Sequence, residues 1–291
     1  MPGFVTGWTP SGELVARPVP VPGPDGPWEP VRRQLAVRGS CLVYGVLDGW
    51  LPAERDPARL APLLGGPDWE RYRRMTNERA AERFLAARLL LKHAAATAVQ
   101  ADPRSLEIWY KLNGRPYVRG CDQVDVSLSH SGTMLVVGIT QRGLIGVDVE
   151  SKDRWMLVPG IEAQVCTPAE REAWAALPED ERNAELIRLW TLKEAYSKAI
   201  GQGLRFRFSE FGFGPGSRPV GGRLPDGSPG AGVEWSFGTF AVDGGYTISF
   251  ALGDAGFGSL GDTAVATMLD PGLVAALAAD LDPPEIPMSG S

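Results

Sequence analysis

The spacing of hydrophobic residues along the chain predicts two long helices. From Asn77 to about Ala98 the apolar positions recur with the helical period, and Thr76 or Asn77 can cap the first turn. The same period predicts a second helix from about Glu179 to Ile200. We expect it to end at Gly201, because glycine readily adopts the left-handed conformation that closes helices.

Short apolar runs bounded by glycine or polar residues predict strands between and after these helices. The expected strands cover residues 41–47, 106–110, 124–129, 134–139, 144–150, 204–208, 233–242 and 246–252. The first strand is expected to end in a turn at Asp48-Gly49, and the four strands from residue 106 to residue 150 are expected to be antiparallel.

This order of elements predicts an α+β fold made of two comparable halves side by side. The expected halves are residues 41–142 and residues 143–252. Residues 1–40 are proline-rich and predict an extended arm, and residues 253–291 predict a loosely held extension with a short helix at 271–280.

Composition places the chain among globular proteins. Its 291 residues are 44% hydrophobic, which is enough to bury a substantial core. The net charge of −6 argues against a nucleic-acid partner. No apolar run reaches the length of a membrane span and the N-terminal residues lack a secretory pattern, so we expect no membrane contact and a cytoplasmic protein. The three cysteines are scattered singly, which excludes a disulfide framework and a cysteine-rich zinc site.

Two acidic residues end the predicted strand at 144–150. Asp148 and Glu150 lie two positions apart, so their side chains are expected on one face of the strand, with Val147 and Val149 on the other. Carboxylate oxygens on one rigid edge suit Mg²⁺, which commonly completes its shell with water and substrate phosphates. The alternative is a solvated strand end without function.

A second acid lies among lysines on the second long helix. Glu194 and Lys198 are four residues apart and share one helix face, and Lys193 is adjacent. Such a pair on an exposed helix is ordinary and needs no function. However, Lys193 and Lys198 are two of only five lysines in an arginine-rich chain. Trp190, one turn before Glu194, places this stretch at the edge of the apolar face of the helix. A half-buried carboxylate between ammonium groups could bind a metal ion or act as a general base.

Basic residues gather at two further places. His130 follows Ser129 at the end of a predicted strand, beside small residues that let an anion approach closely. Arg83 and Arg88 lie on the basic side of the first long helix and could bind phosphate. The alternatives are a surface histidine and a solvated helix face. The usual phosphate-loop, dinucleotide, zinc-protease and hydrolase motifs do not occur.

Three segments taken together resemble a known family. Residues 127–131, 146–150 and 190–198 are similar, in order and spacing, to the signature blocks of 4'-phosphopantetheinyl transferases, and most similar to the two-domain surfactin-synthetase type. The basic helix and residues 113–117 also fit the region upstream of these blocks. The resemblance extends over roughly residues 41–252 and implies a pseudo-twofold pair of α+β subdomains.

The resemblance also implies an activity. Members of the family move the phosphopantetheine arm of coenzyme A to a serine hydroxyl of an apo acyl or peptidyl carrier protein and release adenosine 3',5'-bisphosphate, with Mg²⁺ or Mn²⁺ required. By resemblance, the metal ligands are Asp148, Glu150 and Glu194; the coenzyme A contacts are Arg83, Arg88, Ser129, His130, Lys193 and Lys198; and the catalytic residues are Glu194, Lys198 and His130. Glu194 is then also a candidate base for the carrier serine, either directly or through water, with Glu150 as the alternative.

Some positions depart from the family's pattern. Arg115 stands where a lysine is common, and Asp68 and its neighbours stand where relatives carry lysines before the basic helix. Glu170 matches an acidic family position, but a capping box with Thr167 accounts for it, so it is left out of the site. We expect a monomer. Carriers of fatty acid, polyketide, nonribosomal peptide and lysine biosynthesis present similar serine loops, so the sequence does not select among them. The alternatives are a non-catalytic module that binds coenzyme A or carrier proteins, and a Mg²⁺-dependent phosphohydrolase.

Overall fold

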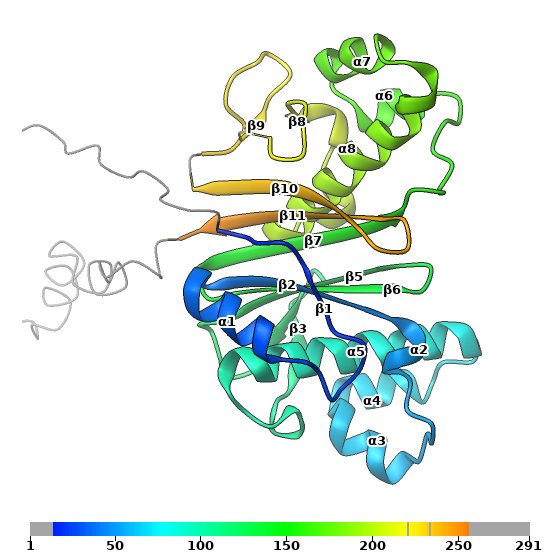
Figure 1. Ribbon diagram of the computed structural model, residues 1–291, viewed down its shortest axis with the longest axis vertical. Coiled ribbons are helices and arrows are strands. Elements are labelled where there is room, and N and C mark those ends of the chain that lie inside the picture. The colour runs from blue at the N-terminus through cyan, green and yellow to red at the C-terminus, as the bar shows by residue number, and fades with distance from the viewer. Residues whose placement is uncertain (1–13, 220, 233, 256–291) are drawn as a thin grey trace, which may run out of the picture. The chain divides into compact units, whose positions relative to one another are not determined.

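Two β-sheets lie next to each other in the computed structural model, and a long helix packs against each (Figure 1). The structure describes residues 14–219, 221–232 and 234–255. The helix predicted at 271–280, together with nearly all of the expected C-terminal extension, lies outside these described residues.

The N-terminal half is built on a four-stranded sheet. Its strands follow the order β1 (Val19–Pro20), β2 (Ser40–Val46), β6 (Met134–Thr140), β5 (Asp125–Ser131), and helix α5 (Glu78–Val99) packs against β6. The buried face of α5 consists of leucine and alanine side chains, which form one hydrophobic core with the inner faces of the strands.

The C-terminal half repeats this arrangement. Its sheet follows the order β10 (Trp235–Val242), β11 (Tyr246–Asp254), β7 (Gly143–Ser151), and helix α8 (Glu179–Ile200) packs on β7 and β11. Each half therefore runs strand, long helix, two strands, with the last strand paired between the other two, as in β2-β6-β5 and β7-β11-β10. The predicted α+β fold with two similar halves is confirmed.

Shorter elements connect these parts. The helices are α1 (Glu29–Arg38), α2 (Leu47–Trp50), α3 (Pro57–Leu64), α4 (Gly66–Tyr72), α6 (Ile161–Val165) and α7 (Pro168–Ala175), with 3₁₀ turns η1 (Pro103–Ser105), η2 (Gly203–Arg205) and η3 (Phe208–Glu210). The remaining strands are β3 (Ile108–Tyr110), β4 (Pro116–Val118), β8 (Gly212–Phe213) and β9 (Gly222–Arg223). Among the residues described, no helix combines the length and hydropathy that a membrane-spanning segment needs.

Local side-chain chemistry fixes the ends of the main helices. The Asn77 side chain accepts a hydrogen bond from the Ala80 amide at 2.9 Å, which caps α5 as predicted. Helix α8 ends at Gly201, whose φ of 70° is left-handed. Thr167 and Glu170 form the predicted capping box at the start of α7.

The N-terminal segment differs from the expected extended arm. Residues 29–38 form α1, and β1 pairs in parallel with β2. Val31 and Leu35 of α1 are buried in the N-terminal core. The prolines indicated an extended chain, but these apolar side chains one turn apart are enough to hold a helix against the sheet.

Asp48 and Gly49 lie in the short helix α2, which follows β2 directly at the predicted turn. Two other local predictions are wrong. Strand β7 pairs with β11 and not with β6, and β3 pairs with β4 in a separate two-stranded sheet, so the predicted antiparallel run holds only for β5 and β6. The segment 204–208 forms η2 and the start of η3 instead of a strand, because Phe206 packs its ring at 5.5 Å from the ring of Tyr196 in an aromatic cluster on α8.

Candidate functional site

The two halves meet where β5 lies beside β7, and side chains join the two strands. The Asp125 carboxylate accepts a hydrogen bond from the Ile145 amide at 2.7 Å, and the Ser127 hydroxyl accepts one from the Val147 amide at 3.1 Å. Alternate residues of a strand share a face, so the next residues of this face also reach β7.

Those next residues contact the two predicted acids. The Ser129 hydroxyl donates to Asp148 Oδ1 at 2.7 Å, and the Ser131 hydroxyl donates to Glu150 Oε2 at 2.7 Å. Asp148 is 6% exposed, whereas Glu150 is half-buried. Each carboxylate is therefore held by one serine of the opposite half. Both side chains lie on one face of β7, as the spacing predicted, and project toward the seam, which is the junction of β5 and β7 between the two halves.

Helix α8 brings the third acid next to them. A Cβ atom at Gly146 would overlap the carbonyl oxygen of Ala195, so glycine is required for α8 to lie this close to β7. Glu194 is half-buried on the adjoining turn. Burial raises the pKa of its carboxyl group, and the charge of Asp148 raises it further, while Lys198 and Arg154 oppose the shift.

A cation accompanies each of the β7 acids. Lys198 Nζ donates to Asp148 Oδ1 at 2.6 Å and to the Ser129 hydroxyl at 2.9 Å, and 29% of its side chain is exposed. Arg154, in the loop after β7, forms an ion pair with Glu150 and lies 5.3 Å from the centre of the Trp190 ring.

The charges of the two helix arginines and of Lys198 act on the histidine. The His130 side chain is largely exposed on β5, but neighbouring residues shield part of its imidazole from water. This desolvation lowers the pKa of the imidazole, and the charges of Arg83, Lys198 and Arg88 lower it further. Four basic side chains from α5, β5 and α8 thus share one region, and their mutual repulsion would be relieved by a bound anion.

A cavity of about 200 Å³ opens between the halves beside Lys198. Gly114, Pro116 and Ser127 line it together with the last turn of α8. Arg115 stabilises this side of the cavity. It donates hydrogen bonds to the carbonyl oxygens of Ala199 at 2.6 Å and Ile145 at 2.7 Å. It also contacts the Asp125 carboxylate and the Lys198 carbonyl oxygen. Arg115 therefore fixes the end of α8 to the N-terminal half and has little capacity left for a ligand.

Lys193 does not belong to this group. Its side chain is fully buried, and its ammonium donates to Glu170 Oε2 at 2.5 Å, the Val165 carbonyl at 2.6 Å and the Phe208 carbonyl at 2.9 Å. All three protons are used within the C-terminal half, so the phosphate contact predicted for Lys193 conflicts with the structure. The helix turns Lys193 to the side opposite the seam, toward α7, where Glu170 serves as its partner in addition to capping that helix.

Asp148, Glu150 and Glu194 have the carboxylate oxygens that a divalent cation prefers, but they are not arranged around a common centre. Three carboxylates from β7 and α8 are the hard oxygen ligands that Mg²⁺ prefers, and the effect of Asp148 on Glu194 shows that their charges repel. Within the residues that the structure describes, no group of three or more His, Cys, Asp or Glu side chains is gathered closely enough to hold an ion. Asp148 and Glu150 are paired with Lys198 and Arg154 instead.

Sequence reasoning missed two residues of this site. Ser131 could have been found, because it follows Ser129 by two positions on the same strand face. Arg154 lies in a loop beyond the strand, where neither spacing nor propensity indicates which side chain it will meet.

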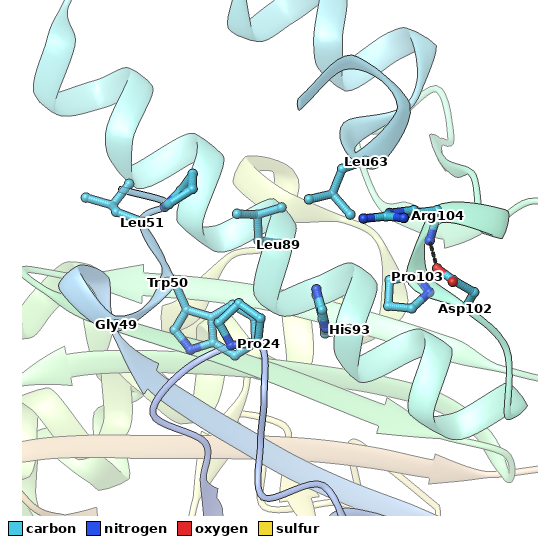
Figure 2. A pocket seen from close by; sticks show the side chains of 11 residues that line it. Pro24, Gly49, Trp50, Leu51, Leu63, Leu89, His93, Asp102, Pro103 and Arg104 are labelled. Atoms are coloured by element: carbon cyan, nitrogen blue, oxygen red, sulfur yellow. Dashed lines mark hydrogen bonds between the residues drawn. The ribbon is translucent and has the colours of Figure 1, made fainter. Parts of the chain in front are cut away.

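A larger cavity than the one beside Lys198 lies in the N-terminal half (Figure 2). It measures about 540 Å³ and is lined mainly by apolar side chains, with His93 and Asp102 among its polar residues. The Asp102 carboxylate accepts the Arg104 amide at 2.7 Å, and the His93 ring is stacked on Trp28 with 6.0 Å between centres. No predicted site residue lines this cavity, and its polar side chains serve local structure.

Comparison with known proteins gives consistent matches. The family model described as the 4'-phosphopantetheinyl transferase superfamily matches residues 144–251. A 4'-phosphopantetheinyl transferase of Bacillus subtilis is 28% identical over 58% of this chain and 74% of its own length. A phosphopantetheinyl transferase of a Thraustochytrium species is 29% identical over 57% of this chain and 62% of its own length. The L-aminoadipate-semialdehyde dehydrogenase-phosphopantetheinyl transferase of Eremothecium gossypii is 30% identical, over 57% of this chain and 61% of its own length.

Proposed function

The chain belongs to the 4'-phosphopantetheinyl transferase superfamily and is an enzyme of that group, and on this premise we propose its reaction. It transfers the phosphopantetheine arm of coenzyme A to a serine hydroxyl of an apo acyl or peptidyl carrier protein. The serine oxygen forms a bond to the phosphorus of the arm, the pyrophosphate bond breaks, and adenosine 3',5'-bisphosphate leaves. The monomeric state and the cytoplasmic location remain predictions.

One observation carries this proposal: at the seam, Lys198 contacts an acid and, together with two arginines, acts on a histidine. Lys198 forms an ion pair with Asp148. Burial lowers the pKa of the His130 imidazole, and the charges of Arg83, Lys198 and Arg88 lower it further. Transfer of a phosphoryl-type group requires neutralisation of phosphate charge and in-line positioning more than covalent help from the protein. Cations for the phosphates and carboxylates for a metal ion supply both.

Asp148, Glu150 and Glu194 would hold Mg²⁺ or Mn²⁺. When bound, the ion supplies positive charge next to the pyrophosphate. His130 and Lys198 bind the phosphates through charge-assisted hydrogen bonds, and Ser129 keeps Lys198 in place at 2.9 Å. Arg83 and Arg88, both on α5, bind the adenosine end.

Glu194 is the proposed base. Its carboxyl group has a raised pKa, which makes it a better proton acceptor than an ordinary surface glutamate. It takes the proton of the carrier serine hydroxyl, directly or through a water molecule, while the serine oxygen attacks. Glu150 is the alternative base, because it is half-buried at the same strand end.

The test is a transfer assay read by intact mass. The protein is incubated with coenzyme A, Mg²⁺ and a panel of apo carrier proteins, with a chelator as control. We expect a phosphopantetheine-sized mass gain that vanishes with the chelator, and we expect Asp148→Asn and Glu194→Gln to abolish it. Asp153→Asn is the matched control, because Asp153 is an exposed acid in the loop after β7.

The outcomes separate the candidate functions. Unchanged turnover in either acid variant would remove that residue from the mechanism. Tight coenzyme A binding without transfer to any carrier would favour the non-catalytic module. Release of adenosine bisphosphate without a carrier would favour the phosphohydrolase.

A further inference from the structure

A buried carboxylate lies directly behind Arg88. Asp68 belongs to α4 and is fully buried. Its Oδ1 atom accepts hydrogen bonds from Arg88 Nε at 3.3 Å and from the Tyr110 hydroxyl at 2.6 Å. A buried charge is costly unless it is paired and hydrogen-bonded, so this carboxylate constrains the groups around it strongly.

The Arg88 guanidinium is held from several sides. Its side chain is 11% exposed, and its central carbon lies 4.6 Å from the ring centre of Phe84 and 5.3 Å from that of Tyr110. Phe84 precedes Arg88 by one helical turn on α5, and Tyr110 ends β3. Two aromatic rings and one carboxylate therefore restrict the orientation of the Arg88 guanidinium.

The outer nitrogens of Arg88 remain available. Within the described residues its Nη atoms donate to no protein group, and they are absent from the buried nitrogens and oxygens that lack a partner. They therefore reach solvent, while Nε is held inside by Asp68. The charge of Arg88 also lowers the pKa of the His130 imidazole, so the guanidinium lies within electrostatic range of the proposed phosphate site.

A second cation of the same helix approaches Asp68 from within the core. Lys92 follows Arg88 by one turn of α5, its side chain is fully buried, and its Nζ has no hydrogen-bond partner. Burial lowers the pKa of Lys92, and Asp68 is the strongest of the charges that oppose this shift. Asp68 thus neutralises positive charge on both neighbouring turns of α5, so that Arg88 can stay close to Lys92.

We propose that Asp68 is a positioning residue for coenzyme A binding. It fixes the Arg88 guanidinium with its two Nη groups facing the ligand, so that no side-chain freedom is lost when the adenosine end or its phosphate binds. The inference rests on the proposed function, which gives Arg88 its ligand.

The experiment compares Asp68→Asn with Glu70→Gln. Glu70 is the matched control, because it lies on the same helix but its carboxylate is paired with Arg73 and Arg74 at the surface. We expect Asp68→Asn to raise the KM for coenzyme A about fivefold to tenfold while kcat stays within about twofold. Glu70→Gln should leave both constants unchanged. Coenzyme A binding measured by calorimetry should weaken in parallel with KM.

A double-mutant cycle with Arg88→Gln tests whether Asp68 acts through Arg88. In an Arg88→Gln background, Asp68→Asn should have little further effect on KM, because the group that it positions is gone. If Asp68→Asn does not fold, Tyr110→Phe removes one hydrogen bond from the same carboxylate and keeps the ring, and a rise of about twofold to threefold in KM is expected.

Two results would overturn the inference: an unchanged KM in folded Asp68→Asn or Tyr110→Phe, or fully additive effects in the cycle. A different result would count against the proposed function instead. If Arg88→Gln alone leaves coenzyme A binding unchanged, the role of Arg88 is wrong whatever Asp68 does.

Discussion

Replacing Lys193 by methionine separates a structural lysine from a ligand-binding one. Lys193→Met keeps the length and the apolar stem of the side chain but removes the ammonium group. That group has three hydrogen bonds, to Glu170 and to the carbonyls of Val165 and Phe208, and no part of it is exposed. The substitution leaves two buried carbonyls and a buried carboxylate without their donor.

The expected loss of stability follows from these contacts. Removing one partner of a buried ion pair typically costs about 3–5 kcal/mol. Glu170 would keep its hydrogen bonds from the amides of Thr167, at 2.8 Å, and Phe213, at 2.6 Å, which places the loss near the lower end of that range. For a protein of this size, the thermal unfolding midpoint of Lys193→Met should be roughly 6–12 °C below that of wild type.

The assay combines thermal and urea unfolding with transfer kinetics. Lys193→Met should be clearly destabilised, and the folded protein should bind coenzyme A with a KM within about twofold of wild type. Lys198→Met is the comparison, since Lys198 is partly exposed and contacts Asp148 in the site. It should lose transfer activity while its free energy of unfolding falls by only about 1 kcal/mol. A stable Lys193→Met variant with a KM raised tenfold would refute the reasoning and return Lys193 to the phosphate site.

Two further predictions concern charge. Because the Arg154 ion pair with Glu150 competes with a metal ion for that carboxylate, Arg154→Gln should bind Mn²⁺ about threefold to tenfold more tightly in an electron paramagnetic resonance titration, and an unchanged affinity would contradict this competition. Burial lowers the pKa of His93 below its ordinary value of 6.5, so the unfolded state binds more protons in the window below that pH and stability should fall as the pH drops through it. His93→Gln should lose less stability than wild type between about pH 7 and about pH 5, as measured by urea midpoints, and equal losses would show that His93 does not contribute.

Much of the secondary structure follows from the sequence alone. Both long helices begin and end within a few residues of the predicted bounds, because caps at Asn77 and Gly201 and a regular apolar period are local signals. The fold class follows from the order of elements. The strand predicted at 204–208 fails, because alternation of Phe206 and Phe208 with polar residues reflects an aromatic cluster and not a sheet.

For the site, the sequence determined which residues share a face on a single element. Asp148 and Glu150 had to project together from β7, and Glu194 and Lys198 from α8, because strand and helix periods fix such relations. The contacts between elements were decided only by the tertiary structure. It placed Ser129 beside Asp148 and turned Lys193 away from the seam toward Glu170.

The physical reason is the range of the interactions. Helix capping and hydrophobic periodicity depend on residues within one or two helical turns, so both can be recognised from residues that are close in sequence. The position of Asp68 behind Arg88, and the close approach of α8 that Gly146 permits, depend on how whole helices pack on sheets. Packing between elements distant in sequence is set by the shape of the entire core, which no local pattern encodes.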